Sequence, residues 1–371
     1  MKKLRIVTSV TNDLSNDQRV RKVCSTFIRE GHEVFAVGRR LETTNESLDH
    51  PFQYYLLNIW WNKGPIFYLA YNLALFLFLI RQRVDIFIAN DLDTLLANYF
   101  ASKWKNVPLI YDSHEYFTEV PELQKQGLKK KIWLKIEAFC LNRIQFAMTV
   151  SHQIQEVYFQ KYGLKFELVR NFPIYNKTKS KAYKQGNPKI VLYQGALNKD
   201  RGLKELVKAA GFLTDDVHIL IAGRGDEYEH LLELSQKMEL GDKLIFLGHV
   251  EIDRLAEITA KASLGLSIEK LDSLNYHFAL PNKVFDYVQS GVPVLYSPFI
   301  ELKALLKDGN IGQKLESHDP MKMAEQIQSM LAHQDYEQWV FNCSKLAKEL
   351  NWEKEEDKLI KLLNLAAQSK A

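Results

Sequence analysis

Cysteine is scarce in this sequence, which argues against the sites and folds that depend on it. The 371 residues include three cysteines, Cys24, Cys140 and Cys343, which lie far apart and form no Cys-x-x-Cys pair or Cys/His cluster. Their odd number and wide spacing argue against a disulfide framework and a zinc site, and favour a reducing compartment. Hydrophobic residues make up 46% and charged residues 25% of the chain, an ordinary soluble composition that excludes collagen, coiled-coil and disordered proteins.

The charge balance is nearly even, and the N-terminus does not follow the pattern of a leader peptide. Lysine and arginine number 49 and aspartate and glutamate 45, a net charge of +4 that does not argue for nucleic-acid binding. The apolar stretch in MKKLRIVTSV is short, and the polar TNDLSNDQR follows at once. We therefore expect a first strand and a cytoplasmic protein, with the inner face of the cell membrane as a further possibility.

Long hydrophobic runs are missing apart from residues 64–80, GPIFYLAYNLALFLFLI. These 17 residues are at the lower limit for crossing a bilayer, contain Asn72 and lie between strand-like segments, so we do not expect a span. Two interpretations stay open: a helix buried on most sides, or a helix at a rim that contacts lipid or a lipid-linked substrate. Residues 125–135 interleave lysines with apolar residues, which suits either a basic amphipathic helix at an anionic membrane or a solvated face. The lysines are Lys125, Lys129, Lys130, Lys131 and Lys135.

Short apolar runs alternate with helical patterns along the chain. In the first half the strand candidates are residues 4–9, 33–37, 86–89, 109–111, 147–150 and 167–169. A helix over residues 18–30 follows the first of them, and the repeated β-α-β spacing predicts a doubly wound parallel sheet. After a polar, lysine-rich interruption the alternation restarts, with strand candidates at residues 189–193, 217–222, 244–247, 264–268 and 294–296.

We therefore predict an α/β protein of two tandem, doubly wound Rossmann-like domains that face a cleft, the usual place for a ligand. The predicted division is an N-terminal domain over residues 1–172, a linker over 173–188 and a C-terminal domain over 189–350. Residues 351–371 are expected to form a helix that packs back toward the N-terminal domain.

In the second domain, glycines and basic residues follow the strands. Gly195 allows close approach of a ligand, and Arg201 with the helix amides near Gly202 suits a phosphate, although a merely solvated arginine is the alternative. The next two strands end in Gly223-Arg224 and Gly248-His249. His249 suits either a nucleobase pocket or the cap of a turn.

The strongest signal is residues 275–294. Pro281 is expected to open a helix that carries Asn282 and Lys283 in its first turn, where the helix dipole disfavours a cation. Lys283 therefore needs an anionic partner, and a diphosphate would serve. Asp286, one turn further on, is placed to accept hydrogen bonds from ribose hydroxyls.

These residues resemble the hallmark of the GT-B retaining glycosyltransferases, in particular family four. Asp286 stands five positions before Gly291 and takes the place of the family's second glutamate, whereas Phe278 stands at the first. Three other residues are candidates for the first glutamate's role if the loop length differs, namely Glu269, Asp272 and Asn275.

The resemblance covers most of the chain and implies further roles. Residues 195–202 are similar to the family's phosphate loop, with Arg201 as one basic residue and Lys199 as a substitute for the other. Gly223, Arg224, Gly248 and His249 look like its nucleotide-side turns. Residues 170–173 resemble the family's crossover, and residues 351–352 its tail.

The first domain is then expected to bind the acceptor. Asp17 and Arg19, in the loop after the first strand, are predicted contacts, although a capping aspartate and a solvent-facing arginine are the alternative. The resemblance places His114 at the reacting sugar. Asp112 and Glu115 are predicted to orient its ring or to bind acceptor hydroxyls.

The resemblance implies a transferase that moves a sugar from a nucleotide-sugar, UDP before GDP, with retention of configuration. We expect a glycan or polyprenyl-linked acceptor in cell-envelope polysaccharide synthesis. Arg201 and Lys283 are expected to neutralise the diphosphate without a metal, and no cofactor is expected besides the donor substrate. An epimerase on the same fold, or an inactive membrane-associated scaffold that the Phe278 departure keeps open, are the alternatives.

Overall fold

The computed structural model of the chain describes residues 3–12, 14, 17–41, 51–61, 63–124, 127–175, 186–306 and 309–369. The chain divides into two compact units, one of Met1–Asn171 with Glu355–Ala371 and one of Phe172–Lys354. The predicted domain boundary at residue 172 lies beside this division. Most of the predicted linker lies outside the described residues, as do Lys125 and residues 13, 15 and 16.

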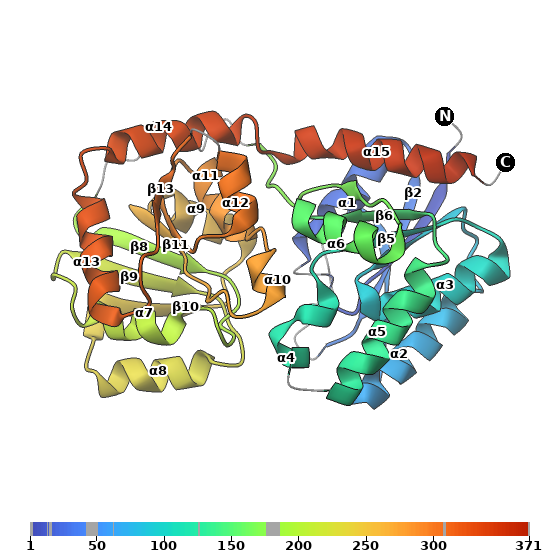
Figure 1. Cartoon of the computed structure of the whole chain (residues 1–371), viewed down its shortest axis with the longest axis horizontal. Helices are drawn as coiled ribbons and strands as arrows, with labels where there is room; N and C mark the ends of the chain where they lie inside the picture. Colours follow the sequence, from blue (N-terminus) through green and yellow to red (C-terminus); the bar gives the residue numbers. More distant parts are fainter. Residues whose placement is uncertain are drawn as a thin grey trace. The chain divides into compact units, whose positions relative to one another are not determined.

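The first unit contains a parallel sheet of seven strands in the order β3-β2-β1-β4-β5-β6-β7. Figure 1 shows this sheet among the helices of the unit, with β2, β5 and β6 labelled. The strands are β1 (Arg5–Ser9), β2 (Glu33–Arg39), β3 (Gln53–Leu57), β4 (Ile86–Asn90), β5 (Leu109–Ser113), β6 (Phe146–Thr149) and β7 (Glu167–Leu168). The helices are α1 (Gln18–Arg29), α2 (Gly64–Leu79), α3 (Leu92–Lys105), α4 (Pro121–Gln124), α5 (Gly127–Leu141), α6 (His152–Tyr162) and most of α15 (Trp352–Gln368), with a 3₁₀ turn, η1, at Phe117–Glu119.

The second unit contains a parallel sheet of six strands in the order β10-β9-β8-β11-β12-β13. The strands are β8 (Lys189–Gln194), β9 (Val217–Ala222), β10 (Leu244–Gly248), β11 (Leu264–Ser267), β12 (Val294–Tyr296) and β13 (Gly312–Lys314). The helices are α7 (Leu203–Ala210), α8 (Tyr228–Lys237), α9 (Ile252–Ala260), α10 (Leu274–His277), α11 (Asn282–Gln289), α12 (Ile300–Leu306), α13 (Pro320–Leu331) and α14 (Tyr336–Ala347), with a 3₁₀ turn, η2, at Gly241–Lys243.

The central strands are apolar at consecutive positions because helices cover both faces of each sheet. All five residues of β4 and of β5 are buried. In β8, Val191 and Tyr193 pack into one hydrophobic cluster and Leu192 into another, so the unit has a core on each side of its sheet. The predicted doubly wound fold is confirmed.

Two strands escaped prediction, and both lie at the edge of a sheet. β3 alternates exposed and partly buried positions as far as Leu56, because successive side chains point to opposite faces of the sheet, and it pairs only with β2. β13 has three residues and begins at Gly312. Neither has the run of buried apolar residues by which the central strands were recognised.

The strand order reverses once in each sheet. In the first unit β1 pairs with both β2 and β4, and in the second β8 pairs with both β9 and β11. Since loops from the carboxyl ends of such neighbouring strands diverge to opposite faces, ligands bind there in open α/β sheets. The β1/β4 and β8/β11 loops are therefore the places to look for sites.

Close packing of α11 on β11 fixes one of these places. The backbone of Gly265 in β11 lies against the ring of Tyr287 in α11, and a Cβ added there would be 2.4 Å from the ring. The Tyr287 hydroxyl donates to the carbonyl of Leu192 at 2.9 Å. This contact sets the position of α11, whose first turn carries Lys283.

Gly265→Ala is therefore expected to destabilise the protein by about 1–3 kcal/mol, because the new methyl group overpacks the contact with Tyr287. Urea unfolding measures the change. Gly211→Ala is the matched control in the same unit, since its Cβ would meet no atom closer than 3.5 Å. Equal stability of the two variants would contradict this account of the packing.

Candidate functional site

A buried carboxylate at the β8/β11 position holds two cations. Glu269 follows the end of β11 and is 2% exposed. Its Oε1 lies 2.8 Å from Nζ of Lys283 and 3.5 Å from Nη1 of Arg201, and its Oε2 accepts a hydrogen bond from Ser267 at 2.8 Å. The structure thus brings the two predicted phosphate-binding cations together around one acid.

Local structure explains how both cations reach Glu269. Pro281 precedes α11, so Lys283 lies in its first turn, with Nζ 3.9 Å from the centre of the Tyr193 ring. Gly195 lies beside this amine and has φ +128, a backbone conformation that favours glycine. Arg201 precedes Gly202, which has φ +71 and would place a Cβ 2.3 Å from the carbonyl oxygen of Ile268. A residue other than glycine at 202 would push the arginine loop away from β11.

The charges around Glu269 do not cancel. Burial alone would raise the pKa of Glu269, but Lys283 and Arg201 outweigh it and hold the pKa below the usual range. The carboxylate is therefore ionised at neutral pH, and the three groups together carry a net charge of +1. Nε of Arg201 and Nζ of Lys283 are buried without a well-aligned hydrogen-bond acceptor among the described residues. An anionic ligand would supply what they lack.

Of the other predicted donor residues, Asp286 lies on α11, Gly195 and Gly223 follow the ends of β8 and β9, and Gly248 ends β10. Asp286 accepts a hydrogen bond from Gln194 at 2.9 Å, which fixes it at the end of β8. A Cβ at Gly223 would lie 2.0 Å from the carbonyl oxygen of Gly195, so the loops after β8 and β9 touch. The amide of Gly223 in turn donates to the carbonyl of Gly248 at 2.7 Å.

Four predicted donor contacts have exposed side chains, namely Lys199, Arg224, His249 and Asn282. Arg224 lies over the ring of Tyr228 at 4.6 Å, and the nearest acid to His249 is Glu251 at 3.6 Å. Nothing in the structure ties these four side chains to Glu269. Their binding roles stay predictions.

Glu269, the acid at the centre of the cluster, was one of three candidates from the sequence for the role of the family's first glutamate. Asp272 is exposed and Asn275 is buried within α10, whereas Glu269 contacts both cations. The signal that could have singled it out is its place two residues beyond a buried strand. Phe278, at the ungapped position, ends α10.

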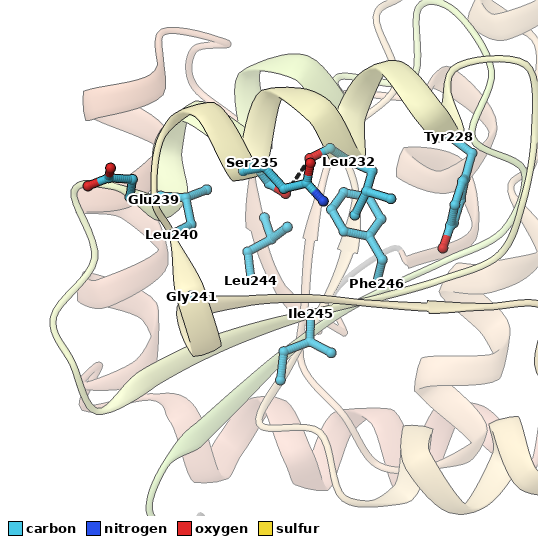
Figure 2. A pocket seen from close by; sticks show the side chains of 10 residues that line it. Tyr228, Leu232, Ser235, Glu239, Leu240, Gly241, Leu244, Ile245 and Phe246 are labelled. Atoms are coloured by element: carbon cyan, nitrogen blue, oxygen red, sulfur yellow. Dashed lines mark hydrogen bonds between the residues drawn. The ribbon is translucent and has the colours of Figure 1, made fainter.

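A separate hollow of about 580 Å³ lies between α8 and the edge strand β10. Figure 2 shows its mainly apolar lining, with Leu232, Leu244 and Phe246 facing it. None of the predicted site residues lines this hollow, and its polar groups do not converge on one point. It has no features of a site for a charged ligand.

In the first unit, His114 lies between two carboxylates at the β1/β4/β5 loops. Its Nδ1 is 3.3 Å from Asp91 and its Nε2 is 3.3 Å from Asp112, and its backbone amide donates to Asp91 at 2.9 Å. Asp91 has φ 57, a conformation that costs energy for a residue other than glycine and that occurs mainly at functional sites. The strained turn aims the Asp91 carboxylate at His114.

Arg19, predicted as an acceptor contact, and Asp112, predicted to orient the His114 ring or to bind an acceptor hydroxyl, are both buried and paired with each other. Arg19 donates to both oxygens of Asp112, at 2.8 and 2.7 Å, and to the carbonyl of Val169 at 2.9 Å. The alternative of a solvent-facing arginine is wrong, since Arg19 is 3% exposed. The pair fixes the acid that faces His114.

The remaining two acceptor candidates lie nearer the surface. Asp17 accepts a hydrogen bond from the amide of Val20 and so caps α1, as the alternative interpretation proposed. Glu115 is partly buried, and its carbonyl accepts a hydrogen bond from the Ser113 hydroxyl at 2.9 Å. Contact of either residue with an acceptor stays a prediction.

The two carboxylates keep His114 protonated. Burial alone would lower the pKa of His114, but Asp91 and Asp112 raise it to about 9. Burial alone would raise the pKa of Asp112, but Arg19 and His114 outweigh it and bring the pKa to about 2. At neutral pH His114 is therefore a hydrogen-bond donor and a cation rather than a free base. Its Nε2 is buried and faces Asp112 at 3.3 Å, although it makes no well-aligned hydrogen bond among the described residues.

Near His114, burial also raises the pKa of Asp93 to about 7, with the charge of Asp91 adding to the effect, and Asp93 accepts a hydrogen bond from Thr11.

Across the residues that the structure describes, no group of three or more His, Cys, Asp or Glu side chains is arranged to hold a metal ion. The expectation of metal independence stays a prediction.

Two protein-family models match the chain. The one described as "Glycosyltransferase Family 4" matches residues 18–173, and the one described as "Glycosyl transferases group 1" matches residues 175–345. The chain belongs to this glycosyltransferase family. The two models cover the two units in turn, and the predicted family resemblance is confirmed.

Solved structures give the same fold over the whole length of this glycosyltransferase. Sucrose-phosphate synthase from Thermosynechococcus elongatus matches with a TM-score of 0.79 at 16% identity, over 99% of this chain and 100% of the other. Anabaena Alr3699/HepE in complex with UDP and glucose matches with a TM-score of 0.74 at 14% identity, over 97% and 99% of the two chains. At sequence identities of 14% and 16%, this structural similarity shows that the chain has the GT-B fold and shows nothing of its substrates.

A curated relative matches over a shorter stretch. N-acetyl-alpha-D-glucosaminyl L-malate synthase of Bacillus anthracis is 25% identical over 149 residues. The match covers 40% of this chain and 37% of that protein, so the chain spans less than half of the relative's length. The substrates that its name implies are therefore those of the relative and are not assigned to this chain.

The raised pKa of His114 is open to a direct measurement. We expect NMR titration of the imidazole to give a midpoint near 9 in the wild type, and a lower one in Asp91→Asn, because a neutral amide no longer stabilises the imidazolium. A wild-type midpoint near the ordinary 6.5 would contradict the clamp between the two carboxylates. Glu251→Gln is the matched control, because its acid faces His249 instead.

The same clamp links stability to pH. Because folding raises the His114 pKa, its stabilising effect is fully present below the unfolded-state pKa of about 6.5 and is lost as the pH rises through about 9. Unfolding free energies measured from pH 6 to 10 should show this loss in the wild type. His114→Gln, which does not titrate, should not show it.

Proposed function

We propose that this glycosyltransferase moves a sugar from a nucleotide-sugar, UDP in preference to GDP, to a glycan or lipid-linked acceptor in cell-envelope polysaccharide synthesis. The observation that carries the proposal is the Lys283–Glu269–Arg201 cluster, with its net positive charge at the β8/β11 loops. A nucleoside diphosphate carries the negative charge that suits a buried lysine and a partly buried arginine beside a strand end. In support, Anabaena Alr3699/HepE is described in complex with UDP-glucose, and S. aureus TarM in complex with fondaparinux, alpha-GlcNAc-glycerol and UDP.

At the donor end, we place the pyrophosphate beside Lys283 and Arg201. Negative charge grows on this group as the bond to the sugar breaks, so the two cations stabilise the transition state more than the ground state. Glu269 holds both cations in position before the donor arrives. Asp286, fixed by Gln194, is offered to the ribose hydroxyls.

At the acceptor end, we place protonated His114 beside the reacting sugar, with its positive charge held by Asp91 and Asp112. As a cation it does not take the acceptor's proton, which we assign to the departing phosphate. Attack on the face that the phosphate leaves retains the anomeric configuration. Lys283 and Arg201 together neutralise the negative charge of the departing diphosphate, and no metal ion takes part.

We place the enzyme in the cytoplasm at the inner face of the membrane, with a polyprenyl-linked glycan as acceptor. In support, one similar structure is described as a glycosyltransferase involved in lipopolysaccharide biosynthesis. Among the described residues no helix is long and apolar enough to cross a bilayer.

Lys283→Ala should lower turnover roughly 30- to 1,000-fold, the equivalent of about 2–4 kcal/mol of transition-state stabilisation, because one of two buried cations is lost. Sugar transfer under saturating donor measures this effect. Lys204→Ala, which removes an exposed lysine on α7, is the control and should leave turnover unchanged. Normal turnover in Lys283→Ala would remove the diphosphate assignment.

Nucleoside diphosphates should raise the melting temperature, UDP more than GDP, because a ligand that binds the native state stabilises it. Lys283→Ala should reduce the shift and His114→Ala should keep it while losing sugar transfer. No shift with any nucleotide would favour the inactive scaffold instead. Formation of an epimer from donor alone would favour the epimerase.

Transfer should persist in EDTA, since two cationic side chains carry out the neutralisation. The assay compares rates in EDTA with rates after Mg²⁺ or Mn²⁺ is restored. Full loss in EDTA that either ion reverses would contradict metal independence and leave the donor assignment standing.

A further inference from the structure

The outer face of α2, α3 and α5 in the first unit is apolar where a protein surface is usually polar. On α2, Ile66, Leu69, Leu73 and Leu77 form an exposed stripe, with Leu69 73% exposed. The opposite stripe, which includes Tyr71 and Leu75, is buried in the unit. A helix that is apolar on all sides needs an apolar environment on each of them.

The exposed apolar face continues across the neighbouring helices, which lie side by side (Figure 1). Tyr68 of α2 meets Trp133 of α5 with ring centres 5.1 Å apart, and Phe100 of α3 meets Phe139 of α5 at 6.0 Å. The further exposed members are Trp104 on α3 and Leu128 and Ile132 on α5. We call these residues, with the α2 stripe, the apolar face.

Asn72, the one polar amide within α2, does not interrupt this face. Its side chain donates to the carbonyl of Asp93 at 2.7 Å and accepts from the amide of Ala97 at 3.2 Å. It therefore joins α2 to α3 and keeps the stripe of α2 turned outward.

Charge on these three helices is almost entirely of one sign. They carry six lysines, on α3 and α5, and two acids, Asp93 and Glu137, both buried. Their net charge, 6 − 2 = +4, equals the +4 of the whole chain, so the remaining residues sum to zero. Lys129, Lys131 and Lys135 are exposed beside Leu128 and Ile132, whereas Lys130 pairs with Glu119 at 2.6 Å.

We infer that the apolar face docks on an anionic lipid bilayer, with its apolar side chains inserted at the headgroup level and the α5 lysines against lipid phosphates. Aromatic and aliphatic side chains flanked by lysine are what an interfacial helix presents to such a membrane. A second copy of the chain fits less well, because the lysines of two such faces would meet with no exposed acid on α2, α3 or α5 to pair with them.

The surface also adjoins the loop that carries His114. Phe117 of η1, three residues after His114, packs its ring on Trp133 of α5 at 5.0 Å. Resting on the proposed function, this placement brings a lipid-linked acceptor to the acceptor loop directly from the membrane.

Sedimentation of the full chain with vesicles tests the inference without relying on activity. We expect binding to phosphatidylcholine vesicles that contain phosphatidylglycerol, weaker binding in high salt, and little binding to phosphatidylcholine alone. Leu69→Glu/Leu73→Glu and Lys129→Glu/Lys131→Glu/Lys135→Glu should each lose at least about tenfold in vesicle affinity, since each lysine contributes near an anionic surface. Unchanged thermal unfolding of both variants shows that they fold.

Ile252→Glu/Met321→Glu is the matched control, because it places the same charges at exposed apolar positions of the second unit. It should bind vesicles like the wild type. Absence of wild-type binding, equal loss in the control, or a dimer in sedimentation equilibrium that the Leu69→Glu/Leu73→Glu variant dissociates would each overturn the inference. Vesicle binding by a chain that transfers no sugar would leave it standing and refute the proposed function.

Discussion

The geometry of the second unit's site depends on one buried carboxylate. Without Glu269, two cations would stand 7% and 25% exposed at a strand end with no counter-charge, an arrangement that burial makes costly. With it, both cations have a fixed partner and keep part of their hydrogen-bonding capacity. Glu269 thus positions the two cations for an anionic ligand, and the cluster keeps a net positive charge.

The two units apply the same topology to opposite charge patterns. At the β8/β11 loops one acid faces two cations, whereas at the β1/β4/β5 loops three acids, Asp91, Asp93 and Asp112, surround Arg19 and His114. The first pattern leaves net positive charge at the loop ends, and the second holds a protonated imidazole between carboxylates. A chain with almost no net charge can therefore assign different substrates to its two halves by local placement alone.

The fold was accessible from sequence because buried parallel strands read as apolar runs, and the strands that were missed, β3 and β13, are edges with weak patterns. Lys283 was recognised because a cation in the first turn of a helix needs an explanation. Glu269 stayed one of three candidates, because its place two residues beyond a buried strand was the one local signal and the two cations that it contacts come from other segments of the chain.

Pairing across long separations was the other limit. Arg19 and Asp112 are 93 residues apart, and only the fold shows that they satisfy each other. The charge of His114 likewise depends on Asp91, which comes from a different loop and adopts a strained conformation. Residue types at strand ends indicated where a site lies, whereas partner and protonation state required coordinates.

The route of the chain between the units has a consequence for genetic exchange. The chain leaves the first unit after Asn171 and returns to it at Glu355. The Glu355 carboxylate accepts a hydrogen bond from the backbone amide of Arg170 at 2.9 Å. The second unit is thus an insertion within the first, and Arg170 and Glu355 bring the two junctions together. The second unit can therefore be exchanged as one contiguous segment, whereas the first unit is built from two separate segments of the chain.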